Sequence, residues 1–166
     1  MNDARIVNKS QNSMTFLLSE KVIETSYRQW LCPANLSSMS ELFEKLEQYW
    51  QSLAFDNATD LDKNTVKLLL EEIFVNIVHY GNCKDSEVKI SLALCQADPA
   101  LHLVLQLEDT GNAFNPLLDA PETTLGLSSE QAPIGGLGVH LIKSMSIKQK
   151  YQRNNHRNQL CLLLAL

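Results

Sequence analysis

The sequence comprises 166 residues, with 45% hydrophobic and 20% charged side chains and a formal net charge of −5. That composition is typical of a globular protein, and we treat residues 1–166 as one domain. No apolar run approaches the roughly 20 residues of a membrane-spanning helix, and the N-terminus lacks the basic and apolar stretches of a secretory signal. We therefore expect a cytoplasmic protein without membrane association, and the acidic balance argues against a general nucleic-acid binder.

The four cysteines show no paired CxxC spacing. This spacing argues against a zinc site and against a disulfide framework, so we interpret all four as reduced thiols. They are Cys32, Cys83, Cys95 and Cys161.

Hydrophobic periodicity and turn residues divide the chain into regular elements. In chain order we expect a flexible arm at 1–13, one or two strands within 14–33, helices over about 38–53 and 60–80, strands over about 86–96 and 101–109, a long loop at 110–134, a helix over about 139–146, and strands near 147–153 and 158–165. The first helix carries an apolar stripe, and Ser38 and Glu41 fit a capping box at its start. This order predicts an α/β (α+β) two-layer sandwich, with the helices on one face of a mixed β-sheet.

Polar side chains form a line on the second predicted helix. At about 100° per residue, Glu72, Asn76 and His79 fall within about 60° of one another, whereas the apolar residues cluster on a different arc. Glu72 could deprotonate a nucleophile, and the side-chain oxygen of Asn76 could bind Mg²⁺. A solvated helix edge explains the same residues, and the helix taken alone favours that interpretation.

A second polar feature, EDTGNAFNP, begins at the end of a predicted strand. Asp109 stands where the strand passes into a loop, which is a common place for ligand contacts, and Gly111 allows the backbone to approach a flat ligand. An ordinary Asp-Thr-Gly turn accounts for the same residues. Taken alone, the motif favours the turn.

The third feature is the glycine-rich run Ile134-Gly135-Gly136-Leu137-Gly138, which leads into a predicted helix. Glycines before a helix N-terminus expose backbone amides that suit a phosphate group. A tight connection between loop and helix is the alternative, because one glycine-rich turn is weak evidence.

The order and spacing of the three features change this balance. Together they resemble the Bergerat-fold ATPases of the gyrase, heat-shock chaperone, histidine kinase and mismatch-repair superfamily. EEIFVNIVHYGN resembles the box that holds the metal, EDTGNAFNP the first glycine box and GGLGVHLIKSM the second. The short length, the run EDTGNAFNPL and the ending YQRNNHRNQLCLLL resemble the anti-sigma-factor serine/threonine kinases of bacterial partner-switching systems. The resemblance covers roughly residues 26–166.

This resemblance implies a role for each motif, with ATP and Mg²⁺ as cofactors. Glu72 would be the general base, Asn76 the Mg²⁺ ligand and Asp109 the acceptor for the adenine amino group. The glycines of the second box would surround the phosphates, residues 112–134 would form the ATP lid, and His79 would either support Asn76 or pack against the sheet. The residues implied at the nucleotide are Asn76, His79, Asp109, Gly111, Ala113, Phe114, Gly135, Gly136, Leu137 and Gly138.

The resemblance also implies protein partners. Such kinases phosphorylate a hydroxyl on a small anti-sigma-factor antagonist, which releases the antagonist and lets the kinase hold its sigma factor. We expect an ATP-dependent protein serine/threonine kinase, with a homodimer as the default state.

The sequence departs from the family pattern in three places, and these departures support an alternative function. Ala113 stands where many relatives have a second glycine, the lid contains no Lys or Arg, and we expect Cys161 where relatives often carry a hydroxyl on the last strand. The alternative is a non-catalytic module of the same fold that uses nucleotide to sequester a partner. The cation-free lid favours this module, whereas the retained Glu72 favours the kinase.

The charge is distributed unevenly along the chain. All 19 acidic residues lie at or before Glu130, whereas residues 131–166 hold five basic residues and no acidic one. Because Lys143 follows the glycine-rich turn within about two helical turns, we interpret the basic excess as a favourable field for a polyanionic nucleotide. The other four basic residues are expected on the solvated surface: Lys148, Lys150, Arg153 and Arg157.

Overall fold

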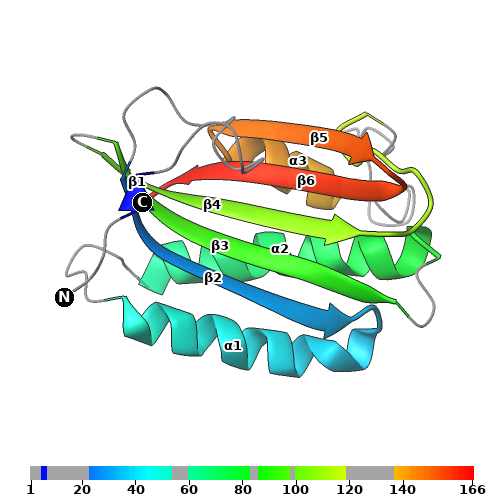
Figure 1. Cartoon of the computed structure of the whole chain (residues 1–166), viewed down its shortest axis with the longest axis horizontal. Coiled ribbons are helices and arrows are strands. Elements are labelled where there is room, and N and C mark those ends of the chain that lie inside the picture. The colour runs from blue at the N-terminus through cyan, green and yellow to red at the C-terminus, as the bar shows by residue number, and fades with distance from the viewer. Residues whose placement is uncertain (1–4, 7–22, 54–59, 83–85, 98–99, 119–136) are drawn as a thin grey trace, which may run out of the picture.

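The structure, a computed structural model, describes residues 5–6, 23–53, 60–82, 86–97, 100–118 and 137–166. Its strands form one sheet, and its helices cover one face of that sheet (Figure 1). The strands are β1 (Arg5–Ile6), β2 (Ile23–Pro33), β3 (Glu87–Ala97), β4 (Ala100–Asp109), β5 (Lys148–Asn154) and β6 (Arg157–Ala165). The helices are α1 (Met39–Ser52), α2 (Asp60–Tyr80) and α3 (Leu137–Met145), and a short 3-10 turn, η2 (Leu36–Ser38), precedes α1. The expected α+β two-layer sandwich is confirmed.

The sheet is antiparallel rather than mixed. Its strand order is β1-β2-β3-β4-β6-β5, and each pairing between described strands is antiparallel. The two helices α1 and α2 return the chain to the end of the sheet where β2 finished, so β3 runs antiparallel to β2. The single helix α3 makes β4 and β5 run in the same direction, but β6 lies between them and pairs with both (Figure 1). The expectation of a mixed sheet is therefore wrong because β6 separates the two parallel strands.

One hydrophobic core lies between the helices and the sheet. α1 contributes the buried part of its apolar stripe, and α2 contributes buried residues from two sides because α1, α3 and the sheet all contact it. Burial of each large apolar side chain contributes about 1.5–3 kcal/mol. The largest side chains without appreciable exposure are Phe74, Leu42, Leu46, Leu69, Leu70, Ile90, Leu92, Leu94, Leu103, Leu105 and Leu107.

The start of α1 differs from the expected capping box. Within the described chain, Ser38 makes no side-chain hydrogen bond that caps α1. Instead, Asn35 Oδ1 accepts hydrogen bonds from Ser38 N at 3.1 Å and from Ser38 Oγ at 3.0 Å, and so caps the η2 turn. Glu41 pairs with Lys45 Nζ at 2.6 Å. The capping-box prediction is wrong because the chain enters α1 through a 3-10 turn, and the residue before that turn, Asn35, carries the cap.

The expected N-terminal arm and ATP lid lie largely outside the described residues. Within the expected arm, Arg5 and Ile6 pair with Glu24 and Ile23, and the rest of the arm lies outside the described residues. The lid from 119 to 134 also lies outside them. None of the described helices combines the length and the apolarity needed to cross a membrane.

Candidate functional site

Three strands bring polar side chains together at one end of the sheet. The register pairs Asp109, at the end of β4, with Asn158 in β6, and it pairs Asn158 with Arg153 in β5. The turn between β5 and β6 is tight, and its residues Asn155 and His156 have φ angles of 50° and 62°. Positive φ at both central residues is typical of the type I′ hairpin turn. This turn sets the register that places Arg153 beside Asn158.

Asn158 is the centre of a hydrogen-bond network on the helix-facing side of the sheet. Its Nδ2 donates to Asp109 Oδ1 and to the backbone oxygen of Asn112, each at 2.8 Å. Its Oδ1 accepts from Tyr151 Oη at 2.8 Å and from Arg153 Nη1. Because both of these donors contact Oδ1, the amide of Asn158 must direct its N–H groups toward Asp109.

The loop that follows β4 folds back onto the same network. The Gly111 backbone N–H donates to Asp109 Oδ1 at 2.8 Å, and Arg153 Nη1 donates to the Gly111 oxygen at 2.9 Å. Asn112 N donates to Gly81 O at 2.7 Å, which connects the loop to the end of α2. Asp109 is only 6% exposed. Its carboxylate is therefore a buried acceptor with a defined orientation, because hydrogen bonds to a charged group are short and directional.

A pocket with an empty volume of about 420 Å³, part of it open to the solvent, lies between α2, β4, β6 and this loop. Most of its wall is apolar, and a few side chains supply polar groups. An apolar wall with a few polar groups is typical of sites for small organic ligands. The described residues that line it are Ile73, Asn76, Ile77, Gly81, Leu107, Asp109, Asn112, Phe114, Pro116, Tyr151, Asn158 and Leu160.

Phe114 connects the pocket to the end of α2. Its ring stacks on Tyr80, with ring centroids 5.6 Å apart and an angle of 28° between the planes. Tyr80 is 51% exposed, and Ala113 is also exposed. The pocket therefore has an aromatic wall that reaches the solvent on this side.

Glu72, Asn76 and Gly138 lie where α2 meets α3. Asn76 lines the pocket, and Glu72 lies one turn earlier, about 6 Å along the helix axis. Gly138 is buried in the first turn of α3, where a Cβ would lie 3.2 Å from Glu72 Cβ and closer still to the carboxylate. The first turn of a helix presents backbone N–H groups without partners inside the helix. A carboxylate, an amide and a helix N-terminus thus adjoin beside the pocket.

Comparison with known proteins agrees with this arrangement. Residues 32–164 match the family model of the histidine kinase-like ATPase domain. The chain belongs to this family. Among solved structures, a chain in the crystal structure of the SiaB–SiaC complex from Pseudomonas aeruginosa is similar, with a TM-score of 0.51 and 17% identity over 84% of this chain and 89% of that chain. None of the curated proteins matches the sequence.

Membership of the histidine kinase-like ATPase domain family implies an ATP-binding domain, and the chemistry of the pocket lining suits an adenine nucleotide. Its apolar walls suit the faces of a flat base, and the fixed acceptor at Asp109 suits an amino group. No group of three or more His, Cys, Asp or Glu side chains that could hold a metal ion occurs among the described residues. Asn76 supplies an amide oxygen, which fits Mg²⁺ because this ion commonly combines one or two protein oxygens with phosphate oxygens.

Among the remaining predicted site residues, the structure describes only the side chain of His79. His79 is exposed, and its ring meets the edge of Tyr80 with centroids 6.3 Å apart, so it packs on an aromatic neighbour and not against the sheet. Gly135 and Gly136 lie outside the described residues, and Leu137 is described only as the first residue of α3.

Cys161 lies on the outer face of the sheet and does not line the pocket, contrary to the expectation that it takes the place of a hydroxyl on the last strand. Side chains alternate along β6, and the buried Leu160 and Leu162 belong to the helix-facing core, so Cys161 points away from it. Burial raises the pKa of the Cys161 thiol to about 12. The β6 side chain beside Asp109 is instead that of Asn158, three residues earlier.

Two of the basic residues expected on the solvated surface make specific contacts, although Arg157 is exposed as expected. Arg153 bonds the Gly111 oxygen and Asn158, and Arg157 Nη1 lies 2.7 Å from Glu108 Oε1. The sequence indicates the orientation of Asn158, because Asn158, Leu160 and Leu162 are spaced two residues apart and therefore point to the same face of the strand, toward the core. A polar residue in that position marks a site, whereas nothing local to β5 indicates the partners of Arg153.

Proposed function

We propose that this chain is an ATP-binding serine/threonine protein kinase of the anti-sigma-factor type, which phosphorylates an anti-sigma-factor antagonist in a partner-switching system. One observation carries the proposal. The pocket contains the paired Asp109 and Asn158 as well as Asn76, and Glu72 lies one turn before Asn76, against the first turn of α3. In the proposed kinase, this arrangement would provide a place for the base, a place for the phosphates and a carboxylate that accepts a proton.

Recognition of the base rests on Asp109. Its Oδ1 is oriented by Gly111 N and by Asn158 Nδ2, so the carboxylate is directed as an acceptor before any ligand enters. An acceptor of this kind prefers the amino group of adenine to the carbonyl oxygen of a 6-oxopurine. The apolar wall of the pocket removes the base from water, and desolvation of its faces adds to the affinity.

The phosphates would extend from the pocket toward α2 and α3. The first turn of α3 carries backbone N–H groups that suit phosphate oxygens, and Asn76 would hold Mg²⁺ through its side-chain oxygen. Mg²⁺, when bound, neutralises part of the phosphate charge. Gly138 allows α3 to approach α2 closely enough for these groups to lie together.

Glu72 would act as the general base in the transfer. The hydroxyl oxygen of the antagonist forms a bond to the γ-phosphorus of ATP, and the bond between that phosphorus and the bridging oxygen of the leaving ADP breaks. Glu72 accepts the hydroxyl proton and later returns it to solvent. General-base catalysis of this kind typically contributes about 10²–10⁴-fold to the rate.

A protein partner is part of the proposal. The similar chain in the SiaB–SiaC crystal structure belongs to a complex, which supports an assembly with another protein here. We propose an antagonist that is released by phosphorylation and a sigma factor that is then held, with a homodimer as the working state of the kinase.

A second candidate function is a non-catalytic module that binds nucleotide to sequester a partner. The observation that favours it is the absence of Lys and Arg from residues 112–134 of the sequence, which leaves this segment without a cation for the γ-phosphate. The two functions share ATP binding and differ only in phosphotransfer.

Calorimetric titration with Mg-ATP tests the shared step. The parent protein should bind, and Asn76→Ala and Asp109→Ala should each weaken binding by about tenfold or more, because each removes a charged or polar contact. Asn64→Ala is a matched control, since Asn64 lies exposed on the same helix as Asn76. A parent protein that does not bind Mg-ATP would exclude both functions.

Incubation with labelled ATP and candidate antagonist domains distinguishes the two functions. The kinase should transfer label to a hydroxyl residue, and Glu72→Gln should reduce the rate by about 10²-fold or more while Mg-ATP binding is retained. Glu71→Gln is the matched control, because Glu71 is the exposed neighbour of Glu72 on α2. Binding of ATP without transfer to any of several domains would favour the sequestering module.

A further inference from the structure

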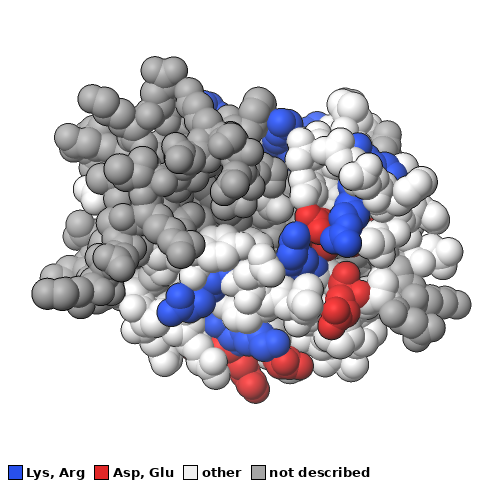
Figure 2. Space-filling model, in the orientation of Figure 1, with Lys and Arg blue, Asp and Glu red and all other residues white. Residues whose placement is uncertain are grey.

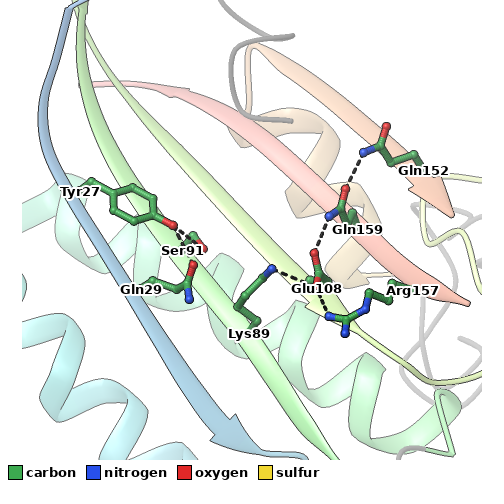
Figure 3. A network of polar contacts seen from close by, with 8 residues as sticks. All are labelled: Tyr27, Gln29, Lys89, Ser91, Glu108, Gln152, Arg157 and Gln159. Carbon is green, nitrogen blue, oxygen red and sulfur yellow. Dashed lines mark hydrogen bonds and ion pairs between the residues drawn. The ribbon is translucent and has the colours of Figure 1, made fainter. Parts of the chain in front are cut away.

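A row of polar side chains crosses the outer face of the sheet, opposite the pocket (Figure 3). Lys89 of β3, Glu108 of β4, Gln159 of β6 and Gln152 of β5 are direct neighbours in the strand register. Basic and acidic side chains are interspersed over the described part of this face (Figure 2). The row therefore connects four adjacent strands on the side that the helices do not cover.

Glu108 is the central residue of this row. It is only 4% exposed, yet its Oε1 lies 2.9 Å from Lys89 Nζ and 2.7 Å from Arg157 Nη1. Gln159 Nε2 donates to the other carboxylate oxygen, and Gln152 Nε2 donates in turn to Gln159 Oε1. We call Lys89, Glu108, Arg157 and Gln159 the Glu108 network. Because the carboxylate is buried, it depends on these partners in place of water.

The Glu108 network lies directly behind the paired Asp109 and Asn158. Glu108 precedes Asp109 in β4, and Arg157 and Gln159 flank Asn158 in β6. Consecutive side chains of a strand point to opposite faces of the sheet. The same register that pairs Asp109 with Asn158 on the inner face thus pairs Glu108 with Gln159 on the outer face.

We propose that the Glu108 network positions the base-binding pair, by holding β4 and β6 in the register and spacing that the hydrogen bond between Asp109 and Asn158 requires. A slip of one residue between these strands would turn Glu108 toward the core and Asp109 toward the outer face. The contacts of Glu108 with Gln159 and Arg157 cannot form in the slipped register. The network therefore specifies the arrangement of the pocket from the opposite side of the sheet.

A contribution to folding stability explains the Glu108 network less well than a role in fixing the strand register. Buried charged groups are often no more stabilising than apolar side chains of similar volume, because desolvation offsets their attraction. Apolar residues already form the rest of the outer-face cluster near Cys161. Unlike these apolar residues, the charged and amide groups of the Glu108 network form their contacts in one register only. The end of β4 needs that register to pair Asp109 with Asn158.

Double-mutant analysis of Mg-ATP binding tests the proposal. This test rests on the proposed function, because it requires the protein to bind ATP. Glu108→Gln and Arg157→Gln should each weaken Mg-ATP binding by about tenfold. Because both substitutions break the same network, the affinity of the double variant should be within about twofold of that of the single variant that binds Mg-ATP more weakly. Arg157 is 58% exposed, so its replacement leaves the core intact. Glu47→Gln is the matched control, because it removes one charge of the ion pair in which Lys63 Nζ lies 3.1 Å from Glu47 Oε2, between α1 and α2; it should leave the affinity within about twofold.

Side-chain amide NMR of the ligand-free protein supplies a readout that does not depend on ATP. Asn158 Nδ2 donates two hydrogen bonds, so its amide signals, assigned by their loss in Asn158→Ala, report the geometry of the pair. Glu108→Gln and Arg157→Gln should shift these signals and speed their exchange with solvent, whereas Glu47→Gln should not. Unchanged Asn158 signals in both network variants would overturn the proposal, even if the affinity for Mg-ATP fell. If the parent protein bound no Mg-ATP, the proposed function would fail, and the amide signals alone would decide the role of the network.

Discussion

Gly138 packs so closely against Glu72 that no side chain fits between them. A Cβ at position 138 would lie 3.2 Å from Glu72 Cβ and 3.3 Å from its Cδ, and closer still to the carboxylate oxygen. Contacts of this length force the neighbouring group to move, and the carboxylate is the part of Glu72 that can move. The position of the proposed general base is thus set by a residue of another helix that has no side chain.

Gly138→Ala should therefore displace the Glu72 carboxylate and slow phosphotransfer at saturating ATP by about tenfold or more, because misplacement of a reacting group by about 1 Å can cost about 10²-fold. The measurement is the initial rate of label transfer to an antagonist domain, with the melting temperature as a check on folding. Ser144→Ala, on an exposed position of the same helix, should leave the rate unchanged. An unchanged rate in Gly138→Ala would show that this contact does not set the position of the base.

Asn158→Asp should weaken Mg-ATP binding by about tenfold or more and lower the melting temperature. The substitution removes the donor that lies 2.8 Å from Asp109 Oδ1 and brings a second carboxylate to the same place. Two carboxylates at this distance repel one another, and loss of a buried hydrogen-bond partner costs about 1–3 kcal/mol. Calorimetric titration and thermal denaturation measure the two effects. Asn154→Asp, at an exposed position four residues away, should change neither, and equal effects at both positions would contradict the role assigned to Asn158.

The contribution of Glu108 to stability should depend on pH. Burial raises the pKa of Glu108, but hydrogen bonds from Gln159, Lys89 and Arg157 together outweigh that effect, so the pKa lies below its ordinary value of 4.5. A carboxyl group with a lowered pKa stabilises the folded state above its ordinary value, and this contribution is lost as the pH falls through the lower folded value. Urea denaturation should show a difference between the parent protein and Glu108→Gln that is constant between about pH 7 and pH 5 and shrinks below 4.5. A difference that persists in full at the acid end would contradict the assignment.

Cys161 should resist alkylation in the folded protein. Burial raises the pKa of its thiol to about 12, so only about one molecule in ten thousand carries the reactive thiolate at about pH 8. Mass spectrometry after treatment with iodoacetamide should find Cys161 unmodified in native buffer and fully modified in denaturant. Because the pKa is raised, the stabilising effect of the neutral thiol is complete below its ordinary value of 9.0 and is lost as the pH rises from there toward 12. Rapid native labelling of Cys161 would place it at an accessible surface and contradict its burial.

Local sequence determined most of the regular elements of this protein. The apolar stripe predicted a helix over 38–53, and α1 spans Met39–Ser52; the strands expected over 86–96 and 101–109 are β3 and β4. Periodicity suffices for these elements because their buried faces repeat every 3.6 or two residues. The layered α+β arrangement followed from the order of the elements, and the motifs at Asn76 and Asp109 indicated residues that both line the pocket.

Only the tertiary structure decided which groups meet. Asn158 bonds Asp109 across 49 positions of sequence, and Arg153 bonds Gly111 across 42. These pairs depend on the insertion of β6 between β4 and β5, which local periodicity does not indicate and which also makes the sheet antiparallel. For the same reason Cys161, which the family pattern suggested for the pocket, lies on the other face, and Arg157 contacts a buried carboxylate. Sequence specifies the faces of each strand, whereas strand order and register determine which side chains those faces bring into contact.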